Sequence, residues 1–174
     1  IDGPFSAGLT ADNDNLVMRA ARSFGVTNGA AITLTKNLPV ASGIGGGSAD
    51  AAAALRALSR LWDLPIPDSA TILKLSADVP VCMTSELSRM HGIGDRIDTL
   101  GPAPMLDILL VNPNVAVSTA QVFGGLANKS NAPMGADMPD PRDRDDWVTW
   151  LLAQRNDLET PARIAAPTID DVLG

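Results

Sequence analysis

The segment with the clearest chemical potential is a glycine-dense loop that runs directly into an alanine-rich stretch. Four of five consecutive positions are glycine, at Gly43, Gly45, Gly46 and Gly47, and Ser48 follows them. If a helix begins there, its free backbone N–H groups and the positive end of its dipole form a site for an anion, most often phosphate. Glycine lets the backbone approach that group closely, and the Ser48 hydroxyl could cap the helix, contact a phosphate or approach a metal.

Several kinds of glycine loop share this composition, including a flexible linker before an alanine-rich core helix. A Walker loop ends in Gly-Lys-Ser or Gly-Lys-Thr, whereas Gly47 is followed by Ser48 with no lysine. The dinucleotide fingerprint G-x-G-x-x-G is nearly met, but it needs a strand leading directly into the first glycine and an acid at a later strand end. Asn37-Leu38-Pro39 interrupts that lead, and the candidate acid Asp63 lies just past the predicted helix. The pattern therefore disfavours a dinucleotide oxidoreductase.

Predicted helices and strands occur in a mixed order around this loop. Apolar residues at helical spacing, preceded by capping residues, predict helices over 16–24, 48–62, 68–75 and 118–126, and a further helix from Asp145 or Asp146. Alternation or short apolar runs predict strands over 30–35, 96–100 and 106–111. Segment 76–80 is predicted to be a turn, because Pro80 disfavours helix for Val79. The polar segment 128–144 is predicted to be a mobile loop, and 101–104 a linker or sharp turn.

The composition indicates one large or two small globular domains in 174 residues, of which 45% are hydrophobic. Twenty acids against 13 bases give a net charge of -7, which argues against a general nucleic-acid or anionic-membrane binder. The sequence has no apolar run long enough to span a bilayer. The single cysteine, Cys82, excludes an internal disulfide and a multi-cysteine metal site, so a cytoplasmic protein is expected.

Other reactive side chains receive plainer interpretations. His91 is the only histidine, so a histidine-based metal site or triad is not expected, and we interpret it as a surface or loop residue. Cys82 is interpreted as a small buried hydrophobe. Trp147 and Trp150 are expected to anchor a helix, and the acids between 137 and 146 to belong to a solvated loop. No metal-ligating set is predicted.

A longer motif around the loop carries a resemblance. The segment Pro39-x-x-x-Gly43-Ile44-Gly45-Gly46-Gly47-Ser48-Ala49 resembles the phosphate-binding motif of the GHMP superfamily, the small-molecule kinases that act on galactose, homoserine, mevalonate and phosphomevalonate. Matching segments follow in the family's order over nearly the whole chain. The combination of Ala77-Asp78-Val79-Pro80 with Asn112-Pro113 selects the members that act on 4-diphosphocytidyl-2-C-methyl-D-erythritol in the non-mevalonate isoprenoid route.

The resemblance implies a fold and a domain order. The expected class is α+β, with a GHMP kinase N-terminal ATP-binding domain of the ribosomal-protein-S5-like type over 1–101 and part of a ferredoxin-like C-terminal domain over 102–174. Family members also carry an upstream segment with a catalytic lysine and a further glycine-rich motif near the C-terminus. The sequence shows neither segment, so we expect the chain to be an internal piece of such an enzyme.

The resemblance also implies an activity, which is ATP-dependent phosphorylation of the substrate's 2-hydroxyl with Mg²⁺ assisting. Asp78 would accept the hydroxyl proton, and Thr119 and Phe123 would bind the cytosine. Asp50 stands where some relatives have Asn, and its charge could either touch the metal or favour the helix start. The residues expected to hold the ATP phosphates are Pro39, Gly43, Gly45, Gly46, Gly47 and Ser48.

Two alternatives stay open beside this interpretation. One is another kinase of the superfamily with a different alcohol substrate, and the other is a non-catalytic nucleotide-binding fragment. The expected partner is a small-molecule substrate, without nucleic acid or membrane, and a homodimer is compatible with the resemblance.

Overall fold

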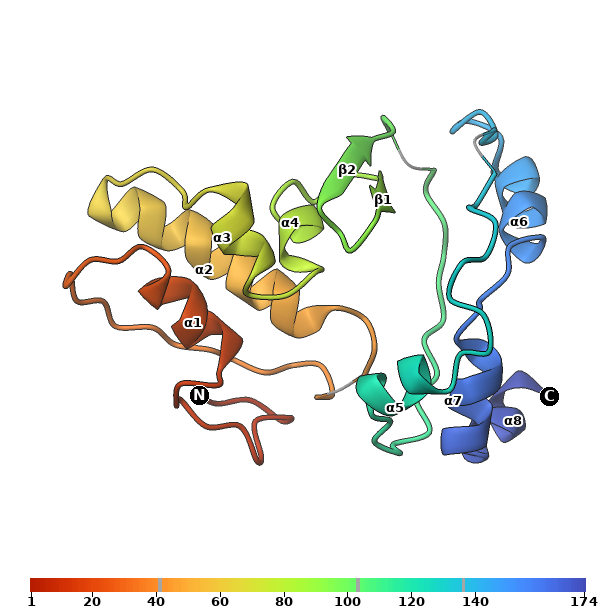
Figure 1. The fold of residues 1–174 in the computed structure, drawn as a ribbon, viewed down its shortest axis with the longest axis horizontal. Helices are drawn as coiled ribbons and strands as arrows, with labels where there is room; N and C mark the ends of the chain where they lie inside the picture. The colour runs from red at the N-terminus through yellow and green to blue at the C-terminus, as the bar shows by residue number, and fades with distance from the viewer. Residues whose placement is uncertain (41, 103, 136) are drawn as a thin grey trace. The chain divides into compact units, whose positions relative to one another are not determined.

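The computed structural model describes residues 1–40, 42–102, 104–135 and 137–174 (Figure 1). The chain divides into two compact units, Ile1–Pro102 and Ala103–Gly174. Three residues of predicted features lie outside the described residues: Ala41 of the glycine motif, Ala103 of the predicted linker and Ala136 of the predicted loop.

Unit 1 contains four helices and one hairpin within its described residues. They are α1 (Leu16–Arg22), α2 (Gly46–Trp62), α3 (Ser69–Leu73), α4 (Val79–Cys82), β1 (Ser88–His91) and β2 (Arg96–Thr99). Side-chain caps start two of the helices: Asn15 accepts from the Val17 N–H at 3.0 Å, and Asp68 accepts from the Thr71 N–H at 2.7 Å. The three helices predicted in this unit are confirmed.

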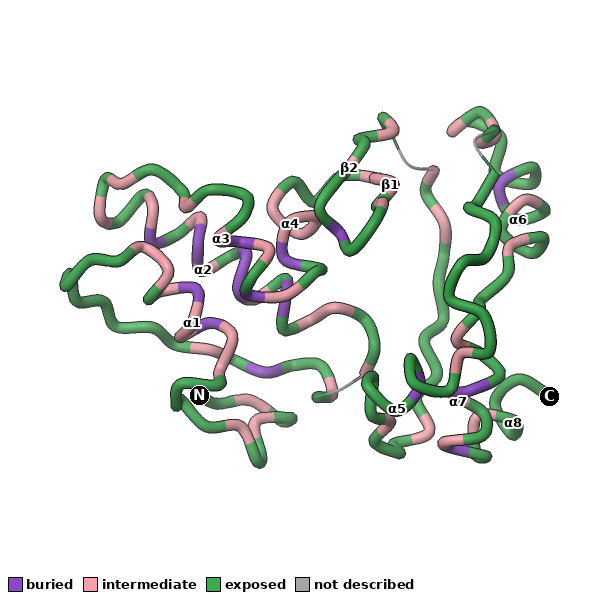
Figure 2. The backbone as a smooth tube through the Cα atoms, viewed as in Figure 1, coloured by how far each residue is buried: buried purple, intermediate pink, exposed green. Residues whose placement is uncertain are grey.

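The core of unit 1 is built around the alanine-rich helix α2. Ala51, Ala52 and Leu55 are completely buried and join one apolar cluster with residues of α1, α3 and α4, including Ala20 and Val79. Figure 2 shows buried stretches, in purple, along both α1 and α2. Because alanine side chains are short, the neighbouring helices can lie close to the α2 backbone.

The hairpin β1–β2 packs against the segment that precedes α4. Its strands are antiparallel, with Ser88 opposite Thr99 and His91 opposite Arg96. The strand near 96–100 is confirmed, whereas β1 was not predicted. In the connecting turn Gly94 has φ +90°, and a Cβ there would lie 2.4 Å from the Ala77 carbonyl oxygen. Only glycine therefore allows the hairpin to approach this backbone.

Three predictions of secondary structure were wrong in whole or in part. No strand forms over 106–111, and over 30–35 only an isolated parallel bridge joins Thr35 to Asp2. Neither segment has a neighbouring strand among the described residues, and without one an apolar run cannot complete its backbone hydrogen bonds as a sheet. The predicted turn 76–80 ends in α4, because Pro80 lies in the first helical turn, where its missing N–H costs nothing.

Unit 2 is helical in the part that the structure describes. Its elements are α5 (Thr119–Gly124), α6 (Arg144–Leu152), α7 (Glu159–Ala165) and α8 (Thr168–Leu173). The helices predicted near 118–126 and from Asp145 or Asp146 are confirmed, with Asp143 as the cap of α6. Trp147 is buried and donates from Nε1 to the Asp140 carbonyl at 3.1 Å, so it anchors α6. The ferredoxin-like assignment of this unit stays a prediction.

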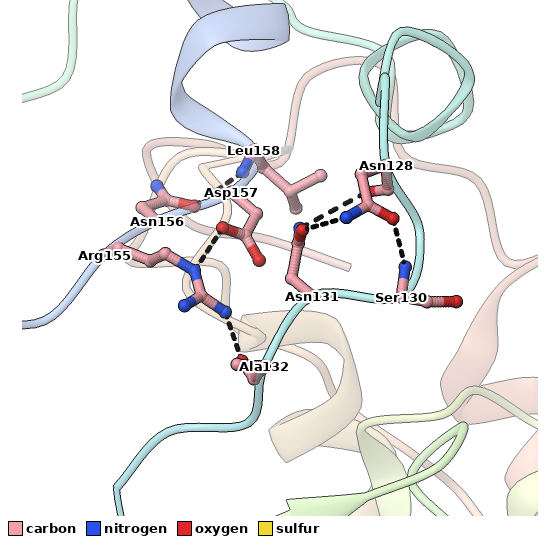
Figure 3. A network of polar contacts seen from close by, with 8 residues as sticks. All are labelled: Asn128, Ser130, Asn131, Ala132, Arg155, Asn156, Asp157 and Leu158. Atoms are coloured by element: carbon pink, nitrogen blue, oxygen red, sulfur yellow. Dashed lines mark hydrogen bonds and ion pairs between the residues drawn. The ribbon is translucent and has the colours of Figure 1, made fainter.

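A polar network fixes the segment after α5 to the start of α7 (Figure 3). Arg155 donates from Nε to the Asp157 carboxylate at 2.6 Å and also to the Ala132 carbonyl. The hydrogen bond from Arg155 lowers the pKa of Asp157. Nearby, the Asn128 amide donates to Asn131 at 2.7 Å. Of the predicted loop 128–144, the described residues before Arg144 form no helix or strand, and Arg144 begins α6. Side chains hold the first part of this segment, and its predicted mobility stays a prediction.

The helices of the described residues include none that is long and apolar enough to cross a membrane.

Candidate functional site

The glycine loop forms the N-terminus of α2. Gly45 is the N-cap residue, with a left-handed φ of 69° that a side chain would disfavour. The first helical hydrogen bond runs from the Ala49 N–H to the Gly45 carbonyl at 2.9 Å. The N–H groups of Gly46, Gly47 and Ser48 precede that bond, so they have no intrahelical acceptor and can bind an anion.

A cavity of about 340 Å³ lies against this loop. The loop residues that line it are Pro39, Gly43, Gly45, Gly46, Gly47 and Ser48, and other segments contribute Asp14, Asn15, Lys36 and Asp50. A Cβ built on Gly43, Gly45 or Gly47 meets no atom within 4 Å. The space that side chains would fill is thus open to a ligand, which is the arrangement that a bound phosphate needs.

Lys36 brings a positive charge to the glycine loop, and sequence reasoning did not find it. The residue is only 8% exposed, and its Nζ lies 2.8 Å from Asp50 Oδ2. A Cβ built on Gly46 would lie 3.5 Å from the same Nζ. One signal was available: Lys36 directly follows the predicted strand 30–35 and continues the alternation of Ile32 and Leu34, so that apolar face leads to a lysine before the loop.

Asp78 lies at the start of α4, outside the residues that line the cavity. Its side chain makes no cap hydrogen bond, and it is exposed. The link to the loop runs through Ser76, whose hydroxyl lies 3.4 Å from the buried Ser48 hydroxyl and 3.5 Å from the Asp78 N–H. The structure therefore connects Asp78 to the glycine loop through one residue and leaves its carboxylate available.

The surroundings of α4 also fix the backbone behind Asp78. Arg56 of α2 donates from Nη1 to the Cys82 carbonyl at 2.9 Å and to the Met83 carbonyl at 3.2 Å, which ties the end of α4 to α2. Burial raises the pKa of the Cys82 thiol, and the negative charge of Asp78 raises it further. A thiol that is harder to ionise is a poor nucleophile, but Cys82 is only partly buried beside the core and not fully buried as predicted.

The two residues predicted to bind cytosine belong to unit 2. Thr119 begins α5, and Phe123 lies one turn further along the same helix with 51% of its surface exposed. An exposed aromatic ring on a short helix is available for stacking. His91, by contrast, is on β1, where its Nε2 lies 2.9 Å from Asp98 Oδ2 across the hairpin.

A second cavity, of about 670 Å³, is lined mainly by apolar residues of α3, α4 and β2. Its two carboxylates, Asp68 and Asp95, both accept backbone N–H groups of their own turns. They serve local structure, so this cavity offers less chemistry than the glycine-loop cavity. Among the described residues, no group of three or more His, Cys, Asp and Glu side chains is arranged to hold a metal.

Comparisons with known proteins agree with the geometry of the glycine loop. Residues 15–96 match the family model described as the GHMP kinases N terminal domain. This segment includes α1, the glycine loop, α2 and the Asp78 turn. The class that this segment resembles, in sequence and in the place of its glycine loop, is therefore the GHMP kinases, through their N-terminal domain.

The more particular likeness is to one enzyme of that class. The chain is 57% identical over 173 residues to "4-diphosphocytidyl-2-C-methyl-D-erythritol kinase" of Ruegeria pomeroyi, which covers 99% of this chain and 62% of the relative. The protein of the same name from Cereibacter sphaeroides is 51% identical over 170 residues, 97% of this chain and 61% of the relative. The chain thus spans about three fifths of the length of these relatives.

A solved structure supports the same likeness. It is described as "Crystal structure of 4-(cytidine 5'-diphospho)-2C-methyl-D-erythritol kinase" and matches with a TM-score of 0.68 at 26% identity. The match covers 94% of this chain and 62% of that chain.

Proposed function

We propose that the protein containing this sequence is an ATP-dependent kinase that phosphorylates the 2-hydroxyl of 4-diphosphocytidyl-2-C-methyl-D-erythritol. The observation that carries the proposal is the open glycine-loop cavity at the N-terminus of α2, connected through the Ser76 hydroxyl to the backbone N–H of Asp78. The names of the similar proteins supply the substrate. We place the reaction in the cytoplasm, because one cysteine in 174 residues is typical of a reducing compartment.

The triphosphate of ATP would bind at the amides of Gly46, Gly47 and Ser48, which line the cavity, and the glycines place no side chain between these amides and a ligand. Phosphoryl transfer depends mainly on positioning and on stabilising negative charge, and both can come from a helix N-terminus. Mg²⁺ usually binds to the substrate phosphates with one or two protein groups, so an all-protein cage is not required. When bound, the ion would neutralise charge on the phosphates.

Asp78 would act on the acceptor. The substrate hydroxyl oxygen forms a bond to the γ-phosphorus, the bond from that phosphorus to the β,γ-bridging oxygen breaks, and ADP leaves. The hydroxyl proton passes to the Asp78 carboxylate. An exposed carboxylate that makes no cap hydrogen bond can take this role, because nothing local competes for it.

The phosphate-binding part of the proposal is tested by replacing Gly46 with leucine. The added side chain would start 3.5 Å from Lys36 Nζ and fill the cavity, so we expect at least a tenfold (order-of-magnitude) loss of affinity for an ATP analogue with Mg²⁺. Calorimetric titration measures this affinity directly. The control is Gly29→Leu, since a Cβ there meets nothing within 4 Å and Gly29 lies outside the cavity. Equal affinity of both variants and the wild type would contradict the assigned phosphate site.

The substrate-binding part is tested by Phe123→Ala. Stacking of a base on an aromatic ring is worth about 1–3 kcal/mol, so we expect the KM for the cytidine substrate to rise about 5- to 150-fold. The KM for ATP should stay within about twofold, because the two substrates use different groups. Steady-state kinetics with each substrate varied in turn measures both values. An unchanged KM for the cytidine substrate would remove Phe123 from its site.

A further inference from the structure

We infer that Asp50 is a positioning residue that holds the Lys36 ammonium beside the glycine loop, ready for the phosphates of the nucleotide. The inference rests on the proposed function, because it explains how the Lys36 side chain in the wall of that phosphate site is held in position. Two observations carry it together: the 2.8 Å ion pair from Lys36 Nζ to Asp50 Oδ2, and the place of both residues on the wall of the cavity.

The backbone of Lys36 is fixed from the opposite side. Its N–H donates to the Asp2 carbonyl at 2.7 Å, and its carbonyl accepts from the Phe5 N–H at 3.1 Å. Gly3 lies so close that a Cβ there would be 2.6 Å from the Lys36 carbonyl oxygen. The start of the lysine side chain is thus held by the segment at residues 2–5, and its tip by Asp50 of α2.

The cavity needs one positively charged side chain fixed in position, because the other described residues of its wall supply no positive side chain. Among the described residues that line it, Lys36 is the only one with a positive side chain, and Asp14 and Asp50 carry negative charges. A free lysine has about 2 kcal/mol of side-chain rotamer entropy to lose on binding a phosphate. An ion pair formed before the nucleotide arrives removes much of that cost, which is the effect of preorganisation on affinity.

The pair leaves the ammonium able to bind a phosphate. A lysine ammonium has three N–H donors, and Asp50 accepts one of them. The position of Nζ beside Gly46 places the other donors near the amides of the loop. Asp50 lies in the second turn of α2, so the same helix supplies both the phosphate-binding amides and the group that orients the lysine.

The test is a double-mutant cycle on the complete protein that contains this sequence, with Asp50→Ala, Lys36→Met and both together. We expect Asp50→Ala to raise the KM for ATP about tenfold while kcat changes less than about threefold. Asp50→Asn keeps an oxygen acceptor and should recover most of the loss. The double variant should resemble Lys36→Met alone, because residues that act as a pair are not additive.

A charge-matched control and a second readout accompany the cycle. Asp63→Asn removes one negative charge at the other end of α2 and tolerates the left-handed backbone at that position, so its KM for ATP should not change. Calorimetry with inorganic tripolyphosphate should show the same order of affinities as the KM values. Acylation of the Lys36 amine in the protein without nucleotide should rise several-fold in Asp50→Ala.

The outcomes separate this inference from the proposed function. If the wild type binds tripolyphosphate and phosphorylates its substrate, but Asp50→Ala stays within twofold of it, the inference alone is overturned. Additive effects of the two substitutions would overturn it as well. If the wild type neither binds nor phosphorylates, the proposed function fails and this inference fails with it, whatever the acylation shows about the ion pair.

Discussion

Asp78→Asn is expected to lower kcat by about 10²- to 10⁴-fold, the usual contribution of a positioned general base. The amide keeps the shape of the carboxylate but cannot accept the hydroxyl proton. Because Asp78 is exposed and makes no cap hydrogen bond, the substitution should leave α4 and the stability of the fold intact. Steady-state kinetics of the complete protein, with the circular dichroism spectrum as a check on folding, measures the effect.

The control for this experiment is Glu86→Gln, an exposed acid that follows α4 and takes no part in the proposed site. Its turnover should equal that of the wild type. Near-normal turnover of Asp78→Asn would remove this carboxylate from the mechanism, even if ATP binding at the glycine loop were established separately.

Gly94→Ala is expected to reduce the free energy of unfolding by about 3 kcal/mol. Two costs combine: alanine is strained at φ +90°, and its Cβ would lie 2.4 Å from the Ala77 carbonyl oxygen. The hairpin or the segment before Asp78 must then shift, so turnover should fall as well. Urea denaturation of the variant, followed by far-ultraviolet circular dichroism, measures the loss of stability.

Gly101 provides a matched control within the same unit. It has the same φ of +90°, but a Cβ there meets nothing within 4 Å. Gly101→Ala should therefore show the backbone strain alone, about 1 kcal/mol, with normal turnover. Equal losses in the two variants would show that close packing against Ala77 contributes nothing.

The parts of the fold that the sequence predicted are those with local causes. The helix after Asn15 and the helix after Asp68 begin at side-chain caps that lie two and three residues from their partners. The alanine run predicted a helix from Ser48, and α2 begins two residues earlier, at Gly46, because the glycines themselves enter the first turn. Such signals can be read from a short window.

The strand predictions were wrong where strand formation depends on pairing with a distant segment. An apolar run such as 106–111 has the composition of a strand, but a sheet forms only when a second segment supplies the hydrogen bonds. In the structure Leu109 is 87% exposed, with no neighbouring strand described. The hairpin shows the converse: β1 was missed because Ser88-Arg89-Met90-His91 has little strand character, and it forms because β2 lies beside it.

The candidate site was predictable to a similar degree. The glycine loop is a contiguous motif, so its position at a helix start follows from the sequence. The ion pair between Lys36 and Asp50 joins residues on the two sides of the loop, and no spacing rule connects a strand-like segment to the second turn of a helix across such a loop. Asp50 could be identified as the partner of Lys36 only once the path of the loop was known.

Helix α2 has two roles. Its first turn presents the anion-binding amides, and its next turns carry Ala51, Ala52 and Leu55 of the core. Binding and folding are therefore thermodynamically linked through one rigid element. A nucleotide at a hundred times its Kd would stabilise the folded form by about 2.7 kcal/mol. Conversely, a substitution that loosens the packing around α2 would lower the affinity for the nucleotide without contacting it. Nucleotide affinity and thermal stability would therefore change together in this unit.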